Sequence, residues 1–458
     1  MADSLQKSEQ PRVSIPAAAT WGGFFASSPL WLAWYITHLP WTGLSEAQAL
    51  PIVLITWFAA LVAAARQLPG VPLPATAGAG LVSAAAGLLV LGSRLVTPAA
   101  SGGPGAGDAV PQAPLIVAGF LTCGALLGLA AGVFGRALKP SPTAIAGTPA
   151  GMAIASIMLA APLLFAGGLV TSADAGMAVP DWPNTFGTNM FLYPLGPRVQ
   201  PVVGHDYASI YLEHAHRLFG ALVGLSTLVL TIWVLRAEKR RWVKVITCSL
   251  FAFVVLQGLL GGQRVVLNTR LLAMFHGVSA QLILAVLVLI AASLSPSFRS
   301  ATAPRVANHR RIRALTGAAV HASILQLILG ATYRHFRDGP GGGHALWTHV
   351  GFSLVVLTVG VLGASLAAGA DAPEAPAHPL VRSLRRSGAL AITLVGIQFG
   401  LGWLTLFLGG REVAAPSVGQ ALLRTAHQAN GALMLAAFTF AAVYARRLSW
   451  LNTRSVPG

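Results

Sequence analysis

Four histidines occupy matching positions in two stretches of apolar sequence, and this spacing is the first sign of chemistry. His216 and His276 lie in the first stretch, and His349 and His427 lie in the second. The aligned segments are HRLFGALVGL (216–225) with HVGFSLVVLT (349–358), HGVSAQLILA (276–285) with HQANGALMLA (427–436), and FVVLQGLLGG (253–262) with LVGIQFGLGW (394–403). We expect two copies of a four-helix unit, each with one histidine in its second helix and one in its fourth.

Paired histidines inside helical bundles suggest that one metal ion is bound from two sides. An ionisable side chain within a membrane span is costly and usually functional, although a lone histidine can simply bond a neighbouring helix. Zinc would require further nitrogen, sulfur or oxygen ligands near each pair, and cysteine is absent from these helix ends. A haem supplies four equatorial nitrogens itself, so two axial histidines suffice.

Glu213 is the most informative carboxylate, because it stands in EHAHR (213–217) at the start of a predicted span. Glu213 and His216 are three residues apart and so share one helical face. A carboxylate beside a haem bound by His216 would relay a proton or stabilise a positively charged intermediate. The alternative is an ion pair with Arg217 or another nearby arginine.

Arginines near the same helix ends are candidate partners for the anionic propionates of a haem. Each has an alternative role as an anchor at the membrane interface. The glycines of GLLGG (258–262) and GLG (400–402) are expected to leave room for a large planar ligand. The four candidate arginines are Arg217, Arg264, Arg270 and Arg424.

The composition supports a membrane location for these sites. Charged residues make up only 9% of the 458 residues, and mean hydropathy is +0.69, whereas soluble domains carry about 25% charged residues. The net charge of +17 comes from basic residues in short loops between apolar segments, which indicates membrane topology and not nucleic-acid binding. Cys123 and Cys248 fall inside apolar segments and are expected to be small buried hydrophobic residues.

Twelve segments are long and apolar enough to be read as spans. The first is interrupted by polar residues and glycine, so an interfacial helix is its alternative. The predicted spans are 19–38, 50–66, 77–97, 114–136, 149–171, 212–235, 244–263, 271–294, 313–334, 345–368, 387–409 and 421–445.

The distribution of Lys and Arg among the loops predicts how the chain is oriented in the membrane, because loops rich in these residues favour the cytoplasmic side. The basic segments are 236–244, 295–312, 369–386 and the tail after 445. Segments 99–113 and 172–210 are poorer in Lys and Arg, so we expect them to face outward. Both termini are then cytoplasmic, and the histidine sites lie toward the outer face.

The predicted fold class is an all-α polytopic membrane protein with two tandem four-helix bundles preceded by three or four extra helices. Residues 149–294 form the first bundle and residues 313–445 the second. Residues 1–148 form a hydrophobic extension for which the sequence suggests no function. The outward segment 172–210 contains several aromatic residues and is expected to cap the first site or to lie as a plain interfacial loop.

The sequence resembles the haem A synthase family over about residues 149–445. The resemblance is carried by GMAVPDWPNTFGTNMFLYP (176–194), EHAHRLFG (213–220), LQGLLGGQRVVLNTRLLAMFHGVSAQLILA (256–285) and the later His349 and His427 segments. The family oxidises the C8 methyl group of haem O to a formyl group by successive hydroxylation, which gives haem A for cytochrome oxidase.

The resemblance implies a bacterial inner-membrane enzyme whose site residues can be named. It implies that His216 and His276 hold the substrate haem O and that His349 and His427 hold haem b, with Glu213 functionally important. Expected partners are the lipid bilayer, haem O synthase, cytochrome oxidase assembly factors and an unidentified electron donor. The cysteine pair that some members carry in the first outward loop is absent from 172–210.

Residues 1–148 do not match a fused haem O synthase. That enzyme needs aspartate-rich motifs for diphosphate and Mg²⁺, and this segment contains only Asp3 and Asp108.

Two rival functions remain open at the level of sequence. A bis-histidine dihaem b-type cytochrome that takes electrons from quinol would share the four histidines but would not need Glu213. A twelve-span transporter is the other rival, although transporters place polar residues at the bilayer midplane and here they gather near the outward helix ends.

Overall fold

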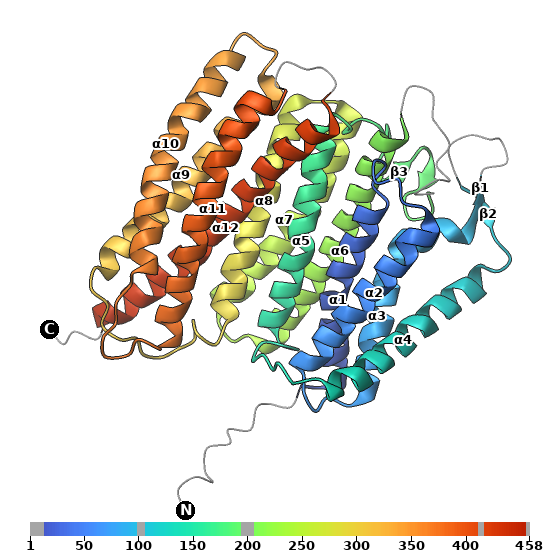
Figure 1. Cartoon of the computed structure of the whole chain (residues 1–458), viewed down its shortest axis with the longest axis horizontal. Helices are drawn as coiled ribbons and strands as arrows, with labels where there is room; N and C mark the ends of the chain where they lie inside the picture. The colour runs from blue at the N-terminus through green and yellow to red at the C-terminus, as the bar shows by residue number, and fades with distance from the viewer. Residues whose placement is uncertain (1–12, 99–105, 194–205, 411–415, 455–458) are drawn as a thin grey trace, which may run out of the picture.

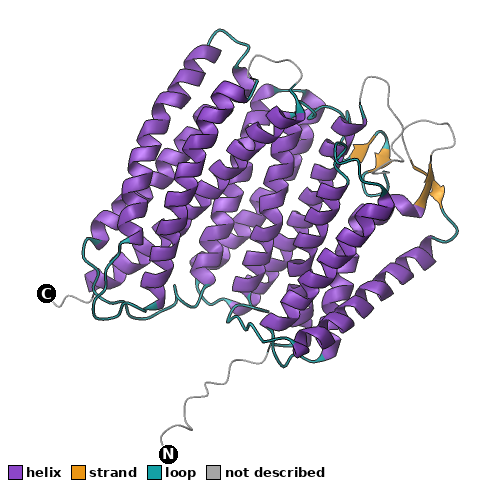
Figure 2. Ribbon diagram, viewed as in Figure 1, coloured by secondary structure: helices purple, strands orange, loops and turns teal. Residues whose placement is uncertain are grey.

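The computed structural model describes residues 13–98, 106–193, 206–410 and 416–454, and within these ranges the chain is almost entirely helical (Figures 1 and 2). Two short antiparallel hairpins lie in loops: β1 (Val96–Pro98) with β2 (Ala106–Ala109), and β3 (Asn184–Thr185) with β4 (Thr188–Asn189). The α-helices are α1 (Ile15–Thr37), α2 (Glu46–Gln67), α3 (Leu73–Leu91), α4 (Ala113–Ala137), α5 (Pro149–Ser172), α6 (Tyr207–Ala237), α7 (Arg241–Leu267), α8 (Arg270–Leu294), α9 (His309–Phe336), α10 (Gly342–Ala368), α11 (Pro379–Leu408) and α12 (Val418–Arg454).

Several helices begin at the polar caps that their sequences provide. The side chain of Asp206 accepts a hydrogen bond from the backbone N–H of Ser209 at 2.7 Å and so caps α6. Thr148 caps α5 in the same way and is followed by a proline in the first turn. These caps satisfy backbone donors that have no partner inside a helix.

The described part of the chain contains eleven helices that are long and apolar enough to cross a membrane, which confirms the prediction of an all-α polytopic membrane protein. Helix α1 is not among the eleven. It nevertheless lies alongside the other helices and packs against α2, α3 and α5, with Trp21 and Trp31 buried (Figure 1). Whether this segment spans the membrane or lies at its interface stays a prediction.

Most helices extend beyond the apolar segments from which they were predicted. Helix α12 runs to Arg454 although its apolar segment was read as 421–445, and α11 begins at Pro379, eight residues before the predicted start. Hydropathy detects the apolar part of a span, whereas the hydrogen-bonded helix continues through the polar residues that follow. Helix α3 is the exception, because it ends at Leu91 and residues 92–98 form a 3₁₀ turn and strand β1.

Helices α5 to α12 pack as two closed rings of four. In the first ring each helix packs on the next from α5 to α8, and α8 closes against α5; α9 to α12 follow the same order. The rings meet where α12 packs against α5 and α8 (Figure 1). The domain boundaries and the internal repeat stay predictions.

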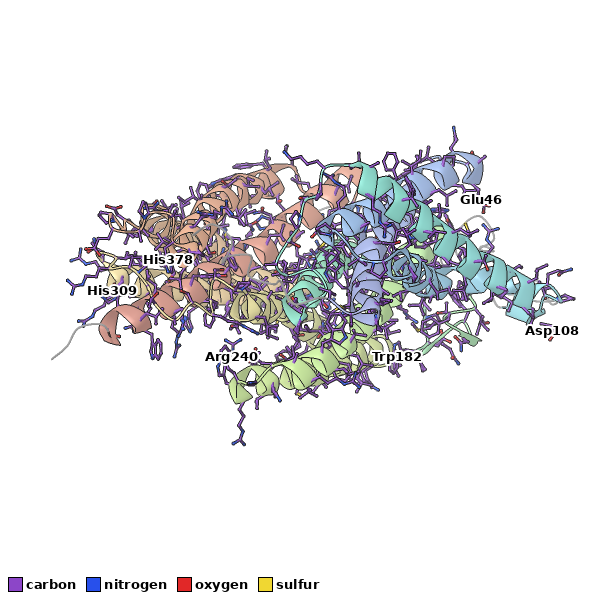
Figure 3. All side chains as sticks on the ribbon, turned by 90° about the horizontal axis from the view of Figure 1, so that it is seen from below. Glu46, Asp108, Trp182, Arg240, His309 and His378 are labelled. Carbon is purple, nitrogen blue, oxygen red and sulfur yellow. The ribbon has the colours of Figure 1, made fainter. Side chains whose placement is uncertain are left out.

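Helices α1 to α4 extend the molecule on the side of the first ring, as the view from below shows (Figure 3). Helix α1 makes the junction. The ring of Trp31 meets Phe219 of α6 edge-on at 5.0 Å, and the hydroxyl of Tyr211 donates to the backbone oxygen of Tyr35 at 3.0 Å. One continuous cluster of buried residues therefore includes both the extension and the first ring.

The prediction that both cysteines are buried hydrophobic residues is wrong. Cys123 is exposed and Cys248 is half-buried. The prediction assumed that an apolar segment is buried in protein, but the outer face of a membrane helix contacts lipid and tolerates apolar side chains there.

Glu238, which follows α6, joins two loops at one end of the molecule. Its carboxylate accepts hydrogen bonds from Arg240 and from Arg299, each at 2.8 Å. The hydrogen bond from Arg240 is the main reason why the pKa of Glu238 is lowered to about 2. This carboxylate ties the α6–α7 loop to the α8–α9 loop.

The contact between α3 and α4 depends on glycine. A Cβ atom on Gly80 would collide with the backbone oxygen of Gly124, and one on Gly128 would collide with the backbone of Thr76.

We predict that Gly80→Ala lowers the stability of the folded protein by roughly 1–3 kcal/mol through overpacking, measured as a lower thermal unfolding midpoint in detergent. Gly119→Ala, on the exposed side of α4 with no atom within 4 Å of the new Cβ, is the control. Equal midpoints for the two variants would contradict the tight α3–α4 contact.

The lowered pKa of Glu238 predicts a pH-dependent contribution to stability. A carboxylate whose folded pKa lies below its ordinary value stabilises the folded state above that ordinary value and loses this contribution as pH falls toward the folded pKa. Glu238→Gln should therefore lower the unfolding midpoint clearly at pH 7 and much less near pH 3. Glu374→Gln, in the exposed α10–α11 loop, is the control. A Glu238→Gln difference that is the same at both pH values would show that its charge does not act in this way.

Candidate functional site

The structure brings the four predicted histidines together as two pairs. The ring centres of His216 (α6) and His276 (α8) lie 6.3 Å apart, with the ring planes at 83°. The ring centres of His349 (α10) and His427 (α12) also lie 6.3 Å apart, with the planes at 84°. The two rings of helices thus hold their histidines in nearly the same geometry.

This spacing suits two imidazoles that bind one metal ion from opposite sides. Two metal–nitrogen bonds of roughly 2.0–2.1 Å each, placed in line, would put the ring centres about 6 Å apart. Two imidazoles are a sufficient protein ligand set when a macrocycle fills the equatorial positions. The arrangement therefore fits axial ligation of a haem at each pair.

All four histidines line one cavity of about 630 Å³, so both pairs open into the same space. The walls come from both rings of helices and are largely aliphatic, with Leu163, Val254 and Leu357 among the lining residues. Such a wall suits the flat apolar body of a porphyrin, while the few polar groups fix its orientation.

Each histidine ring lies against a glycine of the preceding helix. A Cβ atom built on the glycine would lie 2.8–3.4 Å from the Cε1 atom of the facing histidine. A larger residue would therefore displace the imidazole that faces Gly167, Gly261 or Gly330, whereas at Gly402 the new Cβ would make an ordinary van der Waals contact. The facing pairs are Gly167 with His216, Gly261 with His276, Gly330 with His349 and Gly402 with His427. The expectation that these glycine segments make room for the planar ligand was incomplete, since Gly261 and Gly402 make room for the histidines.

Three glutamines next to the histidines were not identified from the sequence. Each lies one helical turn before a facing glycine and lines the cavity: Gln257, Gln326 and Gln398. Their side chains hydrogen-bond the backbone or ring of a histidine. A recurring Q-x-x-x-G pattern on three helices was the signal that could have identified them.

Several buried polar atoms of the site have no protein partner among the described residues. They are Nδ1 of His216, Nδ1 of His276, Oε1 of Gln326, Oγ1 of Thr405 and Nη1 of Arg424. Buried polar groups are nearly always satisfied in native proteins, so unpaired ones at a cavity indicate a missing ligand. The anionic propionates of a haem fit the unpaired Nη1 of Arg424, which is a lining residue of the cavity.

Glu213 lines the cavity on the same helical face as His216, as the three-residue spacing predicted. Its carboxylate accepts hydrogen bonds from the backbone N–H of Val179 at 3.0 Å and from Arg217 at 2.9 Å. The ion pair with Arg217, which was the alternative role expected for Glu213, is therefore present. Glu213 is buried, so it combines this ion pair with a place on the cavity wall.

Arg217 and Arg264 line the cavity and also hold the loop between α5 and α6. Arg217 donates to the backbone oxygens of Val179 and Asp181, and Arg264 donates to that of Gly176 at 2.6 Å. The same loop places Trp182 and Met190 on the cavity wall. Residues 194–205 of the predicted outward segment lie outside the described residues.

Of the other two predicted arginines, one lines the cavity and one lies outside it. Arg424 lines the cavity and donates to the backbone oxygen of Gly409 at 2.6 Å. Arg270 does not line it; its side chain is 62% exposed and lies 3.6 Å from Asp338. Two arginines near the end of α9 that the sequence analysis did not select, Arg334 and Arg337, line the cavity instead. They lie in a short polar run after an apolar segment, which is a weak signal in sequence alone.

The remaining histidines take other positions. His214 is fully buried beneath the α5–α6 loop, where its Nδ1 lies 3.1 Å from the hydroxyl of Thr185. His335 lines the cavity, and His321 and His344 are exposed. His205 lies outside the described residues.

The chain is similar to known proteins over part of its length. Residues 202–341 match a family model described as "Cytochrome oxidase assembly protein". A protein of Symbiobacterium thermophilum named "Heme A synthase" is 30% identical over 281 residues, which cover 56% of this chain and 86% of the relative.

Further relatives with the same name are matched over shorter stretches. The one from Alkalihalophilus pseudofirmus is 28% identical over 31% of this chain and 46% of its own length. The one from Geobacillus kaustophilus is 34% identical over 28% of this chain and 38% of its own length. The chain thus spans half or less of the length of these two relatives.

Proposed function

This chain belongs to the haem A synthase family, and we propose that it converts haem O to haem A by oxidising the C8 methyl group to a formyl group. The observation that carries the proposal is the pair of bis-histidine sites with the same 6.3 Å spacing on one apolar cavity. Glu213 beside the first pair distinguishes that site from the second.

In this proposal the two pairs have different tasks. His216 and His276 would hold the substrate haem O, and His349 and His427 would hold a resident haem b. A bound haem supplies redox chemistry that no amino-acid side chain provides, while the protein supplies position and electrostatics.

The side chains around the first pair would bind and orient the substrate. Arg217 and Arg264 provide positive charge near the carboxylates of a bound haem, and Arg424 does so at the second pair with its free Nη1. Trp182 covers the cavity wall and helps to exclude water. Arg270 has no such role, because its side chain is exposed outside the cavity.

Glu213 is the proton-handling group in this proposal. It lies on the cavity wall, and its ion pair with Arg217 and the N–H of Val179 hold its carboxylate in place. A carboxylate fixed at this position can accept a proton released from the substrate and can stabilise positive charge that develops there.

The same proposal implies a cellular location and a set of partners for the enzyme. The protein would lie in a bacterial inner membrane, with both termini cytoplasmic and the haem sites toward the outer face. Haem O synthase and cytochrome oxidase assembly factors are the expected partners, together with an electron donor.

The equal geometry of the two pairs favours one other function. A dihaem b-type cytochrome that transfers electrons from quinol would need two permanently occupied bis-histidine sites and no substrate pocket. The nature of the bound haem separates this function from the synthase.

The direct test is to identify the haem in protein purified from cells that make haem O. We predict haem B together with haem O, its hydroxylated form or haem A, identified by chromatography and mass spectrometry of the extract. His349→Ala should lose haem B and keep the substrate haem, and His321→Ala on the exposed side of α9 is its control. Haem B alone, at two per chain, would exclude the synthase and support the electron carrier.

The role of Glu213 is tested by Glu213→Gln, which keeps the shape of the side chain and removes its charge. We predict that haem content is retained while the yield of haem A falls by about 10²–10⁴-fold, the usual contribution of a positioned acid or base. Asp206→Asn, at the cap of the same helix, is the control. A normal yield from Glu213→Gln would remove this residue from the mechanism.

A further inference from the structure

The two rings of helices differ in the size of one side chain on the cavity wall. On α7, Gly258 directly follows the glutamine that contacts His276. On α11, Phe399 directly follows the glutamine that contacts His427. Both residues line the cavity. Corresponding places in the two rings therefore hold no side chain in the first ring and a phenyl ring in the second.

The space at Gly258 is open. A Cβ atom built on this residue would meet no atom of the described residues within 4 Å. The same is true of Gly220 on the neighbouring helix α6, which also lines the cavity. Gly220 is four residues after His216, whereas the larger Ser353 is four residues after His349. Two neighbouring helices of the first ring thus leave room that the second ring fills.

These glycines border a gap between α6 and α7. Gln257 reaches α8, and Gly258 is turned by about 100° from it around α7, toward α6, which is the other neighbour of α7 in the ring. From α6, Gly220 and Ala221 line the cavity. Gly258 is exposed, and the next residue, Leu259, is 46% exposed on the outer face of the ring. A long chain in this gap can therefore continue from the cavity into the bilayer.

The second ring is closed at the same level. Phe399 packs edge-on against Trp403, one turn further along α11, with the ring centres 6.1 Å apart, and both line the cavity. The corresponding residues of α7 are Gly258 and Gly262. At Gly262 an added Cβ would lie 2.3 Å from Cδ2 of Trp182, so the α5–α6 loop supplies an aromatic ring there. At Gly258, one turn deeper, the loop supplies none.

We propose that the gap between α6 and α7 takes the long isoprenoid side chain that distinguishes haem O from haem B, and that Gly258 and Phe399 decide which ring accepts which haem. The inference rests on the proposed function, because it assumes that both histidine pairs bind haem. The gap is continuous with the cavity wall on which Nδ1 of His216 and of His276 are buried without a partner among the described residues.

The discrimination works by size in one ring and by burial in the other. An isoprenoid chain at the second pair would meet the phenyl ring of Phe399, so that pair is left to haem B, which has no such chain. At the first pair the chain gains affinity from its burial against apolar wall residues such as Ala221 and Val254. Selectivity is the difference between these two effects. Gly258 and Phe399 are therefore specificity-determining residues.

The first test fills the gap in the full-length protein. Gly258→Phe, purified from cells that make both haems, should contain about 10-fold less haem O and products of haem O than wild type, with haem B retained. A 10-fold loss corresponds to the lost burial of roughly two methylene groups. Leu259→Phe, the next residue on the outer face and not a lining residue of the cavity, is the matched control. Chromatography and mass spectrometry of the extracted haem give both amounts.

Two outcomes of this test would overturn the proposal. One is a haem O content in Gly258→Phe equal to that of wild type. The other is an equal loss of haem O and haem B, because a blocked side-chain gap affects only the haem that has the side chain.

The reciprocal variant opens the second ring. Phe399→Gly is made together with His216→Ala, which disables the first pair, so that the extracted haem comes from the second pair. We expect haem O to rise from less than about a tenth of the bound haem to an amount comparable with haem B. Phe407→Gly in the same background is the control, because Phe407 is 74% exposed on the outer face of α11.

Haem B alone in the Phe399→Gly protein would show that Phe399 does not exclude haem O. Failure of the proposed function gives a different result, because wild-type protein would then contain haem B at both pairs and neither haem O nor its products.

Discussion

The close approach of each histidine ring to a glycine on the preceding helix is the contact on which the site depends. At Gly167, Gly261 and Gly330 a Cβ atom would come within 2.9 Å of the imidazole, so a side chain there would push the ring into the cavity. A glycine faces each of the four rings, and the ring centres of both pairs lie 6.3 Å apart. Rings held back in this way leave room for the cavity that both pairs line.

The end of the cavity near the α5–α6 loop combines positive charge with one carboxylate. Arg217 and Arg264 serve two purposes there, because each bonds the backbone of that loop and also faces the cavity. Glu213 neutralises part of this charge through its ion pair with Arg217. The loop, the carboxylate and the cavity-lining arginines therefore form one connected unit, and a change in any of them should affect the others.

The two pairs are alike in geometry and unlike in their supports. Ser279 and Asn430 complete the glutamine contacts at His276 and His427, whereas Leu163 leaves His216 with an aliphatic neighbour. The same helical scaffold thus surrounds its two histidine pairs with different side chains.

The sequence by itself determined the membrane fold, the pairing of His216 with His276 and of His349 with His427, and the place of Glu213 beside the first pair. Hydropathy and helical spacing are local properties, so they can be read along the chain. Only the tertiary structure decided that both pairs share one cavity, that Arg334 lines it while Arg270 does not, and that the glycines face the histidine rings. These features depend on the rotation and depth of one helix against another, which no single segment of sequence specifies.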